Sequence, residues 1–265
     1  MIYDLHVHST HTDGKHSREE IIEFSKAKKL EYLSFTEHNY YFETVSDDIE
    51  IINGIEFDVK CGESFHLLCY FPNLTPDIER LLKRYRDNTS DSTLRLVEKI
   101  KKNFNFDSSF SYDSIPGKNG YKTKRDVITW LVNNHYCKTV DEASLIFTGK
   151  KAISYVPKFS LTFEEVVDAI HISNGLVVLA HPESLKMNNS DLNCFLRQLV
   201  INGLDGIEVL NVSKNKEKKE LYYLELARKY NLLTSSGSDF HDIYNHQLGV
   251  NNDYSSEIIK RFYKK

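Results

Sequence analysis

Long apolar runs are missing from this sequence. No stretch reaches the roughly 18 apolar residues that a membrane-spanning helix needs, and the first residues lack the charged-then-apolar layout of a signal peptide. The four cysteines form no Cys-x-x-Cys pair, and a chain of 265 residues can build its core without disulfide bonds. These absences predict a cytoplasmic protein with reduced cysteines and no membrane partner.

A surplus of basic charge is also missing. The formal net charge is −4, so the chain has no global positive field that would attract long nucleic acids. We therefore expect no long duplex nucleic acid as a partner. Hydrophobic residues make up 40% and charged residues 27%, which is typical of a soluble globular protein.

Short apolar segments of strand length alternate with helical patterns at both ends of the chain. Two capping-box signatures, Ser17 with Glu20 and Thr162 with Glu165, predict where two helices begin. This alternation predicts a parallel α/β fold. Strands are expected at Ile2–Val7, Tyr32–Thr36, Ile49–Phe57, Phe65–Phe71, Leu176–Ala180, Gly206–Leu210 and Leu232–Ser235.

The middle of the chain breaks this alternation. Residues Thr75–Lys102 have the apolar spacing of one long helix, and two shorter helical patterns follow at Asp126–Asn134 and Val140–Phe147. We therefore expect one domain formed by 1–74 and 158–265, with 75–157 as a mostly helical inserted subdomain.

Histidine is abundant, with eleven residues, and many of them lie near acids. His6 and His8 are two apart on one expected strand, so their side chains point to the same side and can reach one metal ion. Imidazole and carboxylate ligands suit Zn, Mn or Fe. Nine such residues are expected at or just beyond strand ends: His6, His8, Asp13, His38, Glu56, His66, His181, Asp239 and His241.

A single histidine at a strand end is more often structural than a ligand. Nine titratable residues at such positions are different, because their burial without an ion would be costly. In a parallel barrel these ends share one face, where active sites form. His11 and His16 lie in the same early loop, and we expect them to be solvated.

The segments DLHVHSTHTDG, FTEHN, GIE, HLL, AHP, GIEV and GSDFH together resemble the motifs of the polymerase and histidinol phosphatase (PHP) family. Their order and spacing are similar to those of its TrpH-like phosphoesterase branch. The resemblance implies a distorted (β/α)7 TIM-like barrel with two or three divalent ions. By motif position, one ion takes His6, His8, Glu56 and Asp239; a second takes Glu56, His66 and His181; a third takes Asp13, His38 and His241.

The resemblance also implies a reaction. Metal ions lower the pKa of bound water and balance the charge of phosphate oxygens, so hydroxide could attack a phosphoester at neutral pH, with Glu56, Asp13 and His241 in catalytic positions. The expected substrate is a small phosphomonoester of a nucleotide, either a nucleoside 3′,5′-bisphosphate or a short RNA 5′ end. The alternatives are a histidinol-phosphate phosphatase and a PHP module that binds metal without turnover.

Departures from the family pattern concern the substrate. Glu37 replaces an aspartate that is common before the histidine of FTEHN. Thr89 and Ser92 stand where relatives carry arginines in the inserted helix, so other cations must balance phosphate charge. We expect Lys158, Lys214 and Arg125 to bind the substrate.

Overall fold

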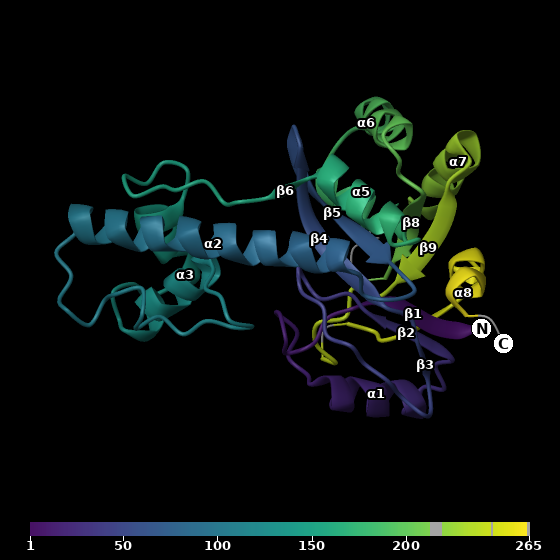
Figure 1. Cartoon of the computed structure of the whole chain (residues 1–265), viewed down its shortest axis with the longest axis horizontal. Coiled ribbons are helices and arrows are strands. Elements are labelled where there is room, and N and C mark those ends of the chain that lie inside the picture. Colours follow the sequence, from purple (N-terminus) through teal and green to yellow (C-terminus); the bar gives the residue numbers. More distant parts are fainter. Residues whose placement is uncertain (213–218, 245, 264–265) are drawn as a thin grey trace. The chain divides into compact units, whose positions relative to one another are not determined.

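The computed structural model describes residues 1–212, 219–244 and 246–263. It divides into two compact units. The first comprises Met1–Leu81 and Leu161–Lys265, and the second comprises Leu82–Ser160. The helix α2 (Pro76–Asn103) begins in the first unit and continues through the second, in agreement with the single long helix predicted from the sequence (Figure 1).

The first unit contains two sheets. One has the order β10-β1-β2-β3, with β1 at Ile2–Val7, β2 at Tyr32–Phe35, β3 at Glu50–Ile51 and β10 at Val250–Asn251. The other has the order β6-β4-β5-β7-β8-β9, with β6 at Leu161–Thr162, β4 at Gly54–Cys61, β5 at Glu63–Tyr70, β7 at Leu176–Leu179, β8 at Gly206–Asn211 and β9 at Leu233–Gly237. Isolated parallel bridges, Val7 with Phe240 and His38 with Glu56, connect the sheets at two places.

Most strand pairs are parallel, as predicted, but β5 is antiparallel to both β4 and β7. The predicted parallel arrangement therefore does not hold for β5, nor for β10, which pairs antiparallel with β1. A parallel pair needs a crossover of a dozen or more residues, whereas only Gly62, at φ +73°, separates the paired residues Cys61 and Glu63. Glycine adopts this left-handed conformation without steric cost, so the chain reverses in a tight hairpin.

Helices cover the sheets on the outside. In the first unit, α5 (Phe163–Ile172) packs on β4 and β7, α7 (Glu220–Tyr230) on β8 and β9, and α8 (Ser256–Phe262) on β9 (Figure 1). The other two helices of eight residues or more in the described part of this unit are α1 (Arg18–Ala27) and α6 (Asn189–Ile201). Both predicted capping boxes are present, with Ser17 and Thr162 as the N-caps.

The second unit has its own apolar core. The inner face of α2 contributes Leu96, Val97 and Ile100, which pack with Phe110 and Trp130. The remaining helices are α3 (Lys124–Asn133), α4 (Val140–Ala143) and a π-helical turn at Ser144–Thr148.

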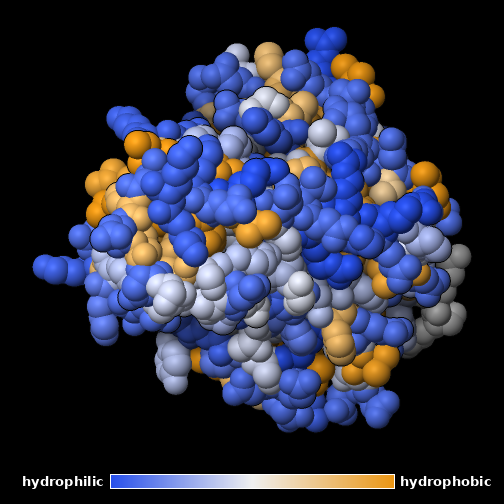
Figure 2. Space-filling model, turned by 60° about the vertical axis from the view of Figure 1, so that its left-hand side comes forward, coloured by the Kyte–Doolittle hydropathy of each residue, from blue (hydrophilic) through white to orange (hydrophobic). Residues whose placement is uncertain are grey.

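In the face shown in Figure 2, hydrophilic residues dominate and hydrophobic ones form scattered groups.

Other differences from the sequence prediction are local. The expected strand Ile49–Phe57 is two strands in different sheets, because β3 ends at Ile51 and β4 begins at Gly54. The two-residue strands β6 and β10 were not predicted, since two residues carry no periodic signal. Within the described residues, no helix combines the length and apolar character needed to span a bilayer.

Candidate metal centre

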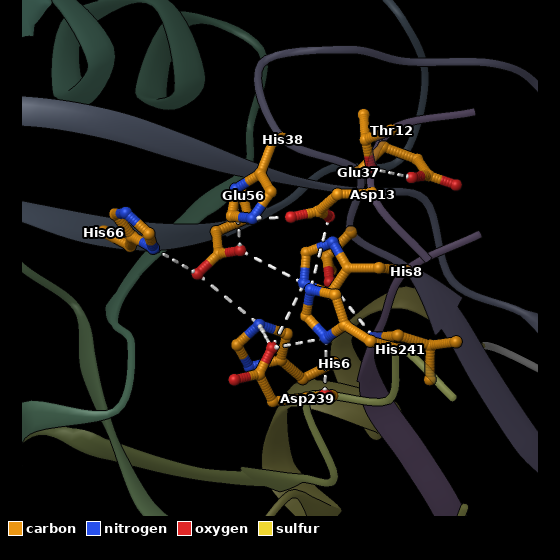
Figure 3. A network of polar contacts seen from close by, with 12 residues as sticks. His6, His8, Thr12, Asp13, Glu37, His38, Glu56, His66, Asp239 and His241 are labelled. Atoms are coloured by element: carbon orange, nitrogen blue, oxygen red, sulfur yellow. Dashed lines mark hydrogen bonds and ion pairs between the residues drawn. The ribbon is translucent and has the colours of Figure 1, made fainter. Parts of the chain in front are cut away.

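The nine histidines and acids singled out in the sequence lie in one cluster in the first unit, shown in part in Figure 3. His6 comes from β1, Glu56 from β4 and His66 from β5, whereas His8 directly follows β1 and the others follow β1, β2, β7 and β9. His66 is near the beginning of β5, opposite Asp58. Because β5 is antiparallel, its beginning reaches the edge where the parallel strands end.

Glu56 lies at the centre of this cluster, with its side chain fully buried. Its Oε1 is 2.9 Å from Nδ1 of His66 and 2.9 Å from Nε2 of His181. Its Oε2 is 3.1 Å from Nδ1 of His38 and 3.2 Å from Nε2 of His8. One carboxylate therefore faces histidines from four different segments, as expected of a group that bridges two ions.

The other two acids occupy separate sides of the cluster. Oδ1 of Asp239 lies 3.5 Å from Nε2 of His6 and 3.4 Å from Nε2 of His8. Oδ1 of Asp13 lies 3.2 Å from Nε2 of His241 and 3.8 Å from Nε2 of His38. Asp13 is a quarter exposed and Asp239 only 4% exposed, so the Asp13 side faces solvent.

The acids control protonation within the cluster. Burial alone would lower the pKa of His8, but the carboxylates of Asp239 and Glu56, 3.4 and 3.2 Å from its Nε2, raise it to about 9. Burial has the same effect on His66, and the charge of Glu56 with the bond to Asp58 raises that pKa to about 10. Burial would raise the pKa of Glu56, but the surrounding histidines hold it well below its usual range. Positive charge thus gathers where metal ions would otherwise supply it.

The donor set fits divalent ions. His6 Nε2, His38 Nδ1 and Glu56 Oε2 are buried, and none has a hydrogen-bond partner among the residues that the structure describes. Such atoms are rare in proteins unless a ligand satisfies them. Four overlapping groups have ligand atoms within 4.8 Å of one another: His8, Asp13, His38 and His241; His6, Glu56 and His181; His6, His8 and Asp239; His38, Glu56 and His66.

These groups overlap with the ligand scheme inferred from the motifs but differ from it at several residues; Glu56, for example, is grouped with His6 and His181 and not with His6, His8 and Asp239. His8 joins the Asp13 group as well as the Asp239 group. His66 is grouped with His38 and Glu56, whereas the motif scheme paired it with His181. Nitrogen and carboxylate oxygen donors of this kind favour Zn, Mn or Fe.

The backbone at two of these positions is in the left-handed region. His181 has φ +25° and Asp239 has φ +53°, and neither is a glycine. Each such residue costs on the order of 1–3 kcal/mol, and the cost is sustained where surrounding contacts fix the conformation. Asp4 supplies such contacts near Asp239, because it accepts hydrogen bonds from the backbone N–H of Ser238 (2.9 Å) and His6 (3.2 Å).

Sequence reasoning missed several buried acids around the cluster. Asp4, Glu37 and Glu208 are at most 1% exposed, and Asp58 lies 2.8 Å from Nε2 of His66. Asp4 and Glu208 stand inside the DLHVH and GIEV segments, so their positions were visible although their contacts were not. Burial raises the pKa of Asp4 to about 6, against the effect of its hydrogen bonds with Ser238 and Gly249.

The remaining predicted residues lie elsewhere. Arg125 and Lys158 belong to the second unit, and Lys214 lies outside the described residues.

The expectation that His16 is solvated was wrong. Its side chain is 14% exposed, packs edge-on against Phe24, and accepts a hydrogen bond from the backbone N–H of Ile243 (3.2 Å).

Comparison with known proteins agrees with this arrangement. The family model for the PHP domain matches residues 4–171. The chain is 24% identical to a 5′-3′ exoribonuclease of Haemophilus influenzae, over 97% of this chain and 96% of that protein. It is 28% identical to a phosphoribosyl 1,2-cyclic phosphate 1,2-diphosphodiesterase of Eggerthella lenta, over 91% and 94%. It is 23% identical to a 3′,5′-nucleoside bisphosphate phosphatase of Chromobacterium violaceum, over 90% and 86%.

Solved structures share the fold. A crystal structure of a protein from Bifidobacterium adolescentis, described as a putative metal-dependent phosphoesterase, superposes with a TM-score of 0.74. The match covers 99% of this chain and 96% of the other at 21% identity, so it supports the fold.

Proposed function

The chain belongs to the PHP domain family and is a metal-dependent phosphoester hydrolase, and we propose that it acts on phosphomonoesters of nucleotides. The favoured substrates are a nucleoside 3′,5′-bisphosphate and the 5′ end of a short RNA. The single observation that carries the proposal is the cluster around Glu56, where nine histidines and acids lie together and buried donor atoms among them lack hydrogen-bond partners. Two of the three relatives described above are named for RNA or nucleotide substrates, and the third is named for a phosphoribosyl cyclic phosphate.

In the proposed site, the nine residues would hold two or three Mn, Zn or Fe ions, and Glu56, which belongs to two of the donor groups, would be shared between them. Ions bound there would supply a nucleophilic water at neutral pH and balance the charge of phosphate oxygens. The residues themselves divide by exposure. His6, His8 and Glu56 are fully buried, whereas His38, Asp13 and His241 are about a quarter exposed and His66 is 32% exposed. The phosphate therefore enters from the Asp13 side.

We also propose that the two sheets form the distorted (β/α)7 barrel of the family. The support comes from the two isolated bridges, which link β1 to the segment after β9 and the segment after β2 to β4. With these links, seven strands follow one another in a ring: β1, β2, β4, β5, β7, β8 and β9. The ladder at both links is a single bridge, which accounts for the distortion.

The region 75–157 is proposed as the substrate cap, with Arg125, Lys158 and Lys214 as phosphate-binding residues. Within the second unit, burial and then the nearby charge of Lys158 lower the pKa of Lys124, so two cations lie close together there. An anion between them would relieve this repulsion, and lysine and arginine are the usual charge partners of a phosphate dianion.

A substrate panel with Mn²⁺ tests the proposal. It comprises a nucleoside 3′,5′-bisphosphate, a short 5′-phosphorylated RNA, histidinol phosphate, and a mono- and a diester of nitrophenol. We expect the highest kcat/KM on one of the two nucleotide substrates. Preference for histidinol phosphate would replace the proposed substrate with the alternative one. Preference for the diester would overturn the phosphomonoester assignment.

A further inference from the structure

Two buried carboxylates lie outside the ligand set: Glu208 contacts two residues of the cluster, and Glu37 contacts the loop that carries Asp13. Resting on the metal centre proposed above, we propose that Glu208 and Glu37 are positioning residues, each of which supports a different metal site. Glu208 holds the ring of His6 and the backbone of His181 in position. Glu37 fixes the loop that carries Asp13. Neither carboxylate belongs to any of the four donor groups found among the described residues.

Glu208, on β8, is 1% exposed and contacts two ligand residues at once. Its Oε1 lies 3.0 Å from Nδ1 of His6, which leaves Nε2 of that ring directed at Glu56 and Asp239. A carboxylate on one ring nitrogen fixes the tautomer and makes the other nitrogen a better metal ligand. The side chain of Asn211 donates to Oε2 at 3.2 Å and thereby holds Glu208 in place.

The second contact of Glu208 is to the backbone. The N–H of His181 donates to Oε2 at 2.7 Å, although His181 has the unfavourable φ of +25°. This bond stabilises the conformation in which Nε2 of His181 lies 2.9 Å from Glu56. One carboxylate therefore sets the ring of one ligand and the main chain of another, both next to Glu56.

Glu37 acts on the other side, as Figure 3 shows: it lies next to Thr12, outside the ring of donors around Glu56. It is fully buried and accepts hydrogen bonds from the backbone N–H of Ser9 (3.1 Å) and from the hydroxyls of Ser9 and Thr12. The N–H of Gly14 donates to the carbonyl of Ser9 at 3.0 Å. Asp13 lies between these two anchored residues, Thr12 and Gly14.

An arginine holds Glu37 in turn. Nε of Arg18 is 3.6 Å from Oε1 of Glu37. Its Nη1 donates to the carbonyl of Phe42 (2.7 Å) and to the hydroxyl of Thr44 (2.6 Å). The arginine is 4% exposed, so the pair is screened little by solvent. This network links the Asp13 loop to the segment after β2, which also carries His38.

Removing one carboxylate should therefore weaken one part of the centre and spare the other. Glu208→Gln should weaken Mn²⁺ binding about ten- to a hundredfold at the sites that use His6 and His181, the usual cost of losing an outer hydrogen bond to a metal ligand. Glu37→Gln should release only the ion held by the Asp13 group. The measurement is Mn²⁺ bound per chain by metal analysis after dialysis against a series of free Mn²⁺ concentrations.

A double-mutant cycle assigns each effect to a site. Asp13→Asn removes a ligand of the exposed group, so Glu37→Gln should add nothing further in that background, whereas Glu208→Gln should keep its full effect. Glu164→Gln, at an exposed position in the first turn of α5, is the matched control and should bind metal like wild type. Circular dichroism confirms that each variant is folded, and Glu→Asp variants replace any that are not.

Three experimental outcomes would each contradict one part of this inference. Unchanged Mn²⁺ binding in folded Glu208→Gln overturns its part of the inference. An additive effect of Glu37→Gln and Asp13→Asn overturns the role of Glu37. Wild-type protein that binds no Mn²⁺ overturns the proposed metal centre itself, and this result is separate from the other two because hydrolysis is not the readout.

Discussion

Both units of this chain have apolar cores, but in the described part of the chain only the first also buries a cluster of acids and histidines. The first holds a fully buried Glu56 among histidines, with Asp4, Glu37 and Glu208 around them. The second, Leu82–Ser160, encloses apolar and aromatic side chains such as Phe110 and Trp130. Among the described residues of the second unit, no group of three or more potential metal ligands is present.

This difference between the two interiors distinguishes residues that stabilise the fold from residues that are suited to chemistry. An apolar core stabilises a fold without any partner, because burial of hydrophobic surface is favourable by itself. A buried cluster of acids and histidines costs free energy unless its atoms are satisfied. The first unit therefore contains the proposed reaction site, whereas the buried residues of the second unit show how that unit is held together.

Metal removal should have the largest effect, and it should act on the first unit, which contains the cluster around Glu56. Prolonged chelation should abolish phosphoester hydrolysis, because the donor atoms around Glu56 then lack their ions, and Mn²⁺, Zn²⁺ or Fe²⁺ should restore it. The assay follows phosphate release before chelation, after it and after addition of each metal. Full activity in a sample that metal analysis proves metal-free would contradict the proposed chemistry.

Glu56→Gln is the strongest single change. The amide is neutral and its nitrogen cannot bind a cation, so the variant should lose bound metal and activity together, with kcat/KM reduced by at least about a thousandfold, the upper range for loss of one charge-stabilising group. Metal analysis and kinetics on the same sample check this. Retention of all ions by folded Glu56→Gln would show that it is not the bridge.

Phe110→Ala tests how much the apolar core of the second unit contributes to its stability. Phe110 is fully buried, so its loss should destabilise the second unit by about 3–5 kcal/mol through the cavity left behind. Hydrogen exchange should show faster opening of 82–160, while Mn²⁺ content stays at the wild-type level. Lys102→Ala, at an exposed position on α2, is the control and should leave exchange unchanged. Loss of metal in Phe110→Ala would mean that metal binding in the first unit depends on the stability of the second.

The sequence predicted that these histidines and acids lie close together, and the reason is physical. His6 with His8, and Asp239 with His241, have a spacing that apolar packing does not require, and they lie near the ends of short apolar strands. Their gathering followed from the strand pattern. The antiparallel direction of β5 did not, since it depends on the tight turn at Gly62. The contacts of Glu208 and Glu37 were also beyond prediction, because they link residues far apart in the sequence.

Asp13→Asn should have a smaller effect than Glu56→Gln. Asp13 is partly exposed and belongs to one donor group, whereas Glu56 belongs to two. We expect the loss of one ion per chain and a decrease in kcat of about a hundredfold, the scale of one electrostatic contact in the transition state. Metal analysis at saturating Mn²⁺ gives the stoichiometry. A variant with all ions and the wild-type rate would remove Asp13 from the third site.

The smallest expected effects concern the proposed substrate contacts, Arg125, Lys158 and Lys214. Each alanine variant should reduce kcat/KM about ten- to a hundredfold on the best nucleotide substrate, because a hydrogen bond to a charged group contributes about 1.5–3 kcal/mol. Metal content should not change. A residue that binds a remote phosphate should mainly raise KM, whereas one that contacts the transferred group should lower kcat.

Comparison of two substrates sharpens this last prediction. If these residues bind a second phosphate, their loss should matter for a nucleoside 3′,5′-bisphosphate and little for a nitrophenyl phosphomonoester, which has no second phosphate. Lys102→Ala again serves as the exposed control in the same unit. If all three variants match wild type on both substrates, none of these three residues contributes charge to recognition. A small phosphomonoester, held by the ions and neutral contacts alone, would then be favoured over the bisphosphate.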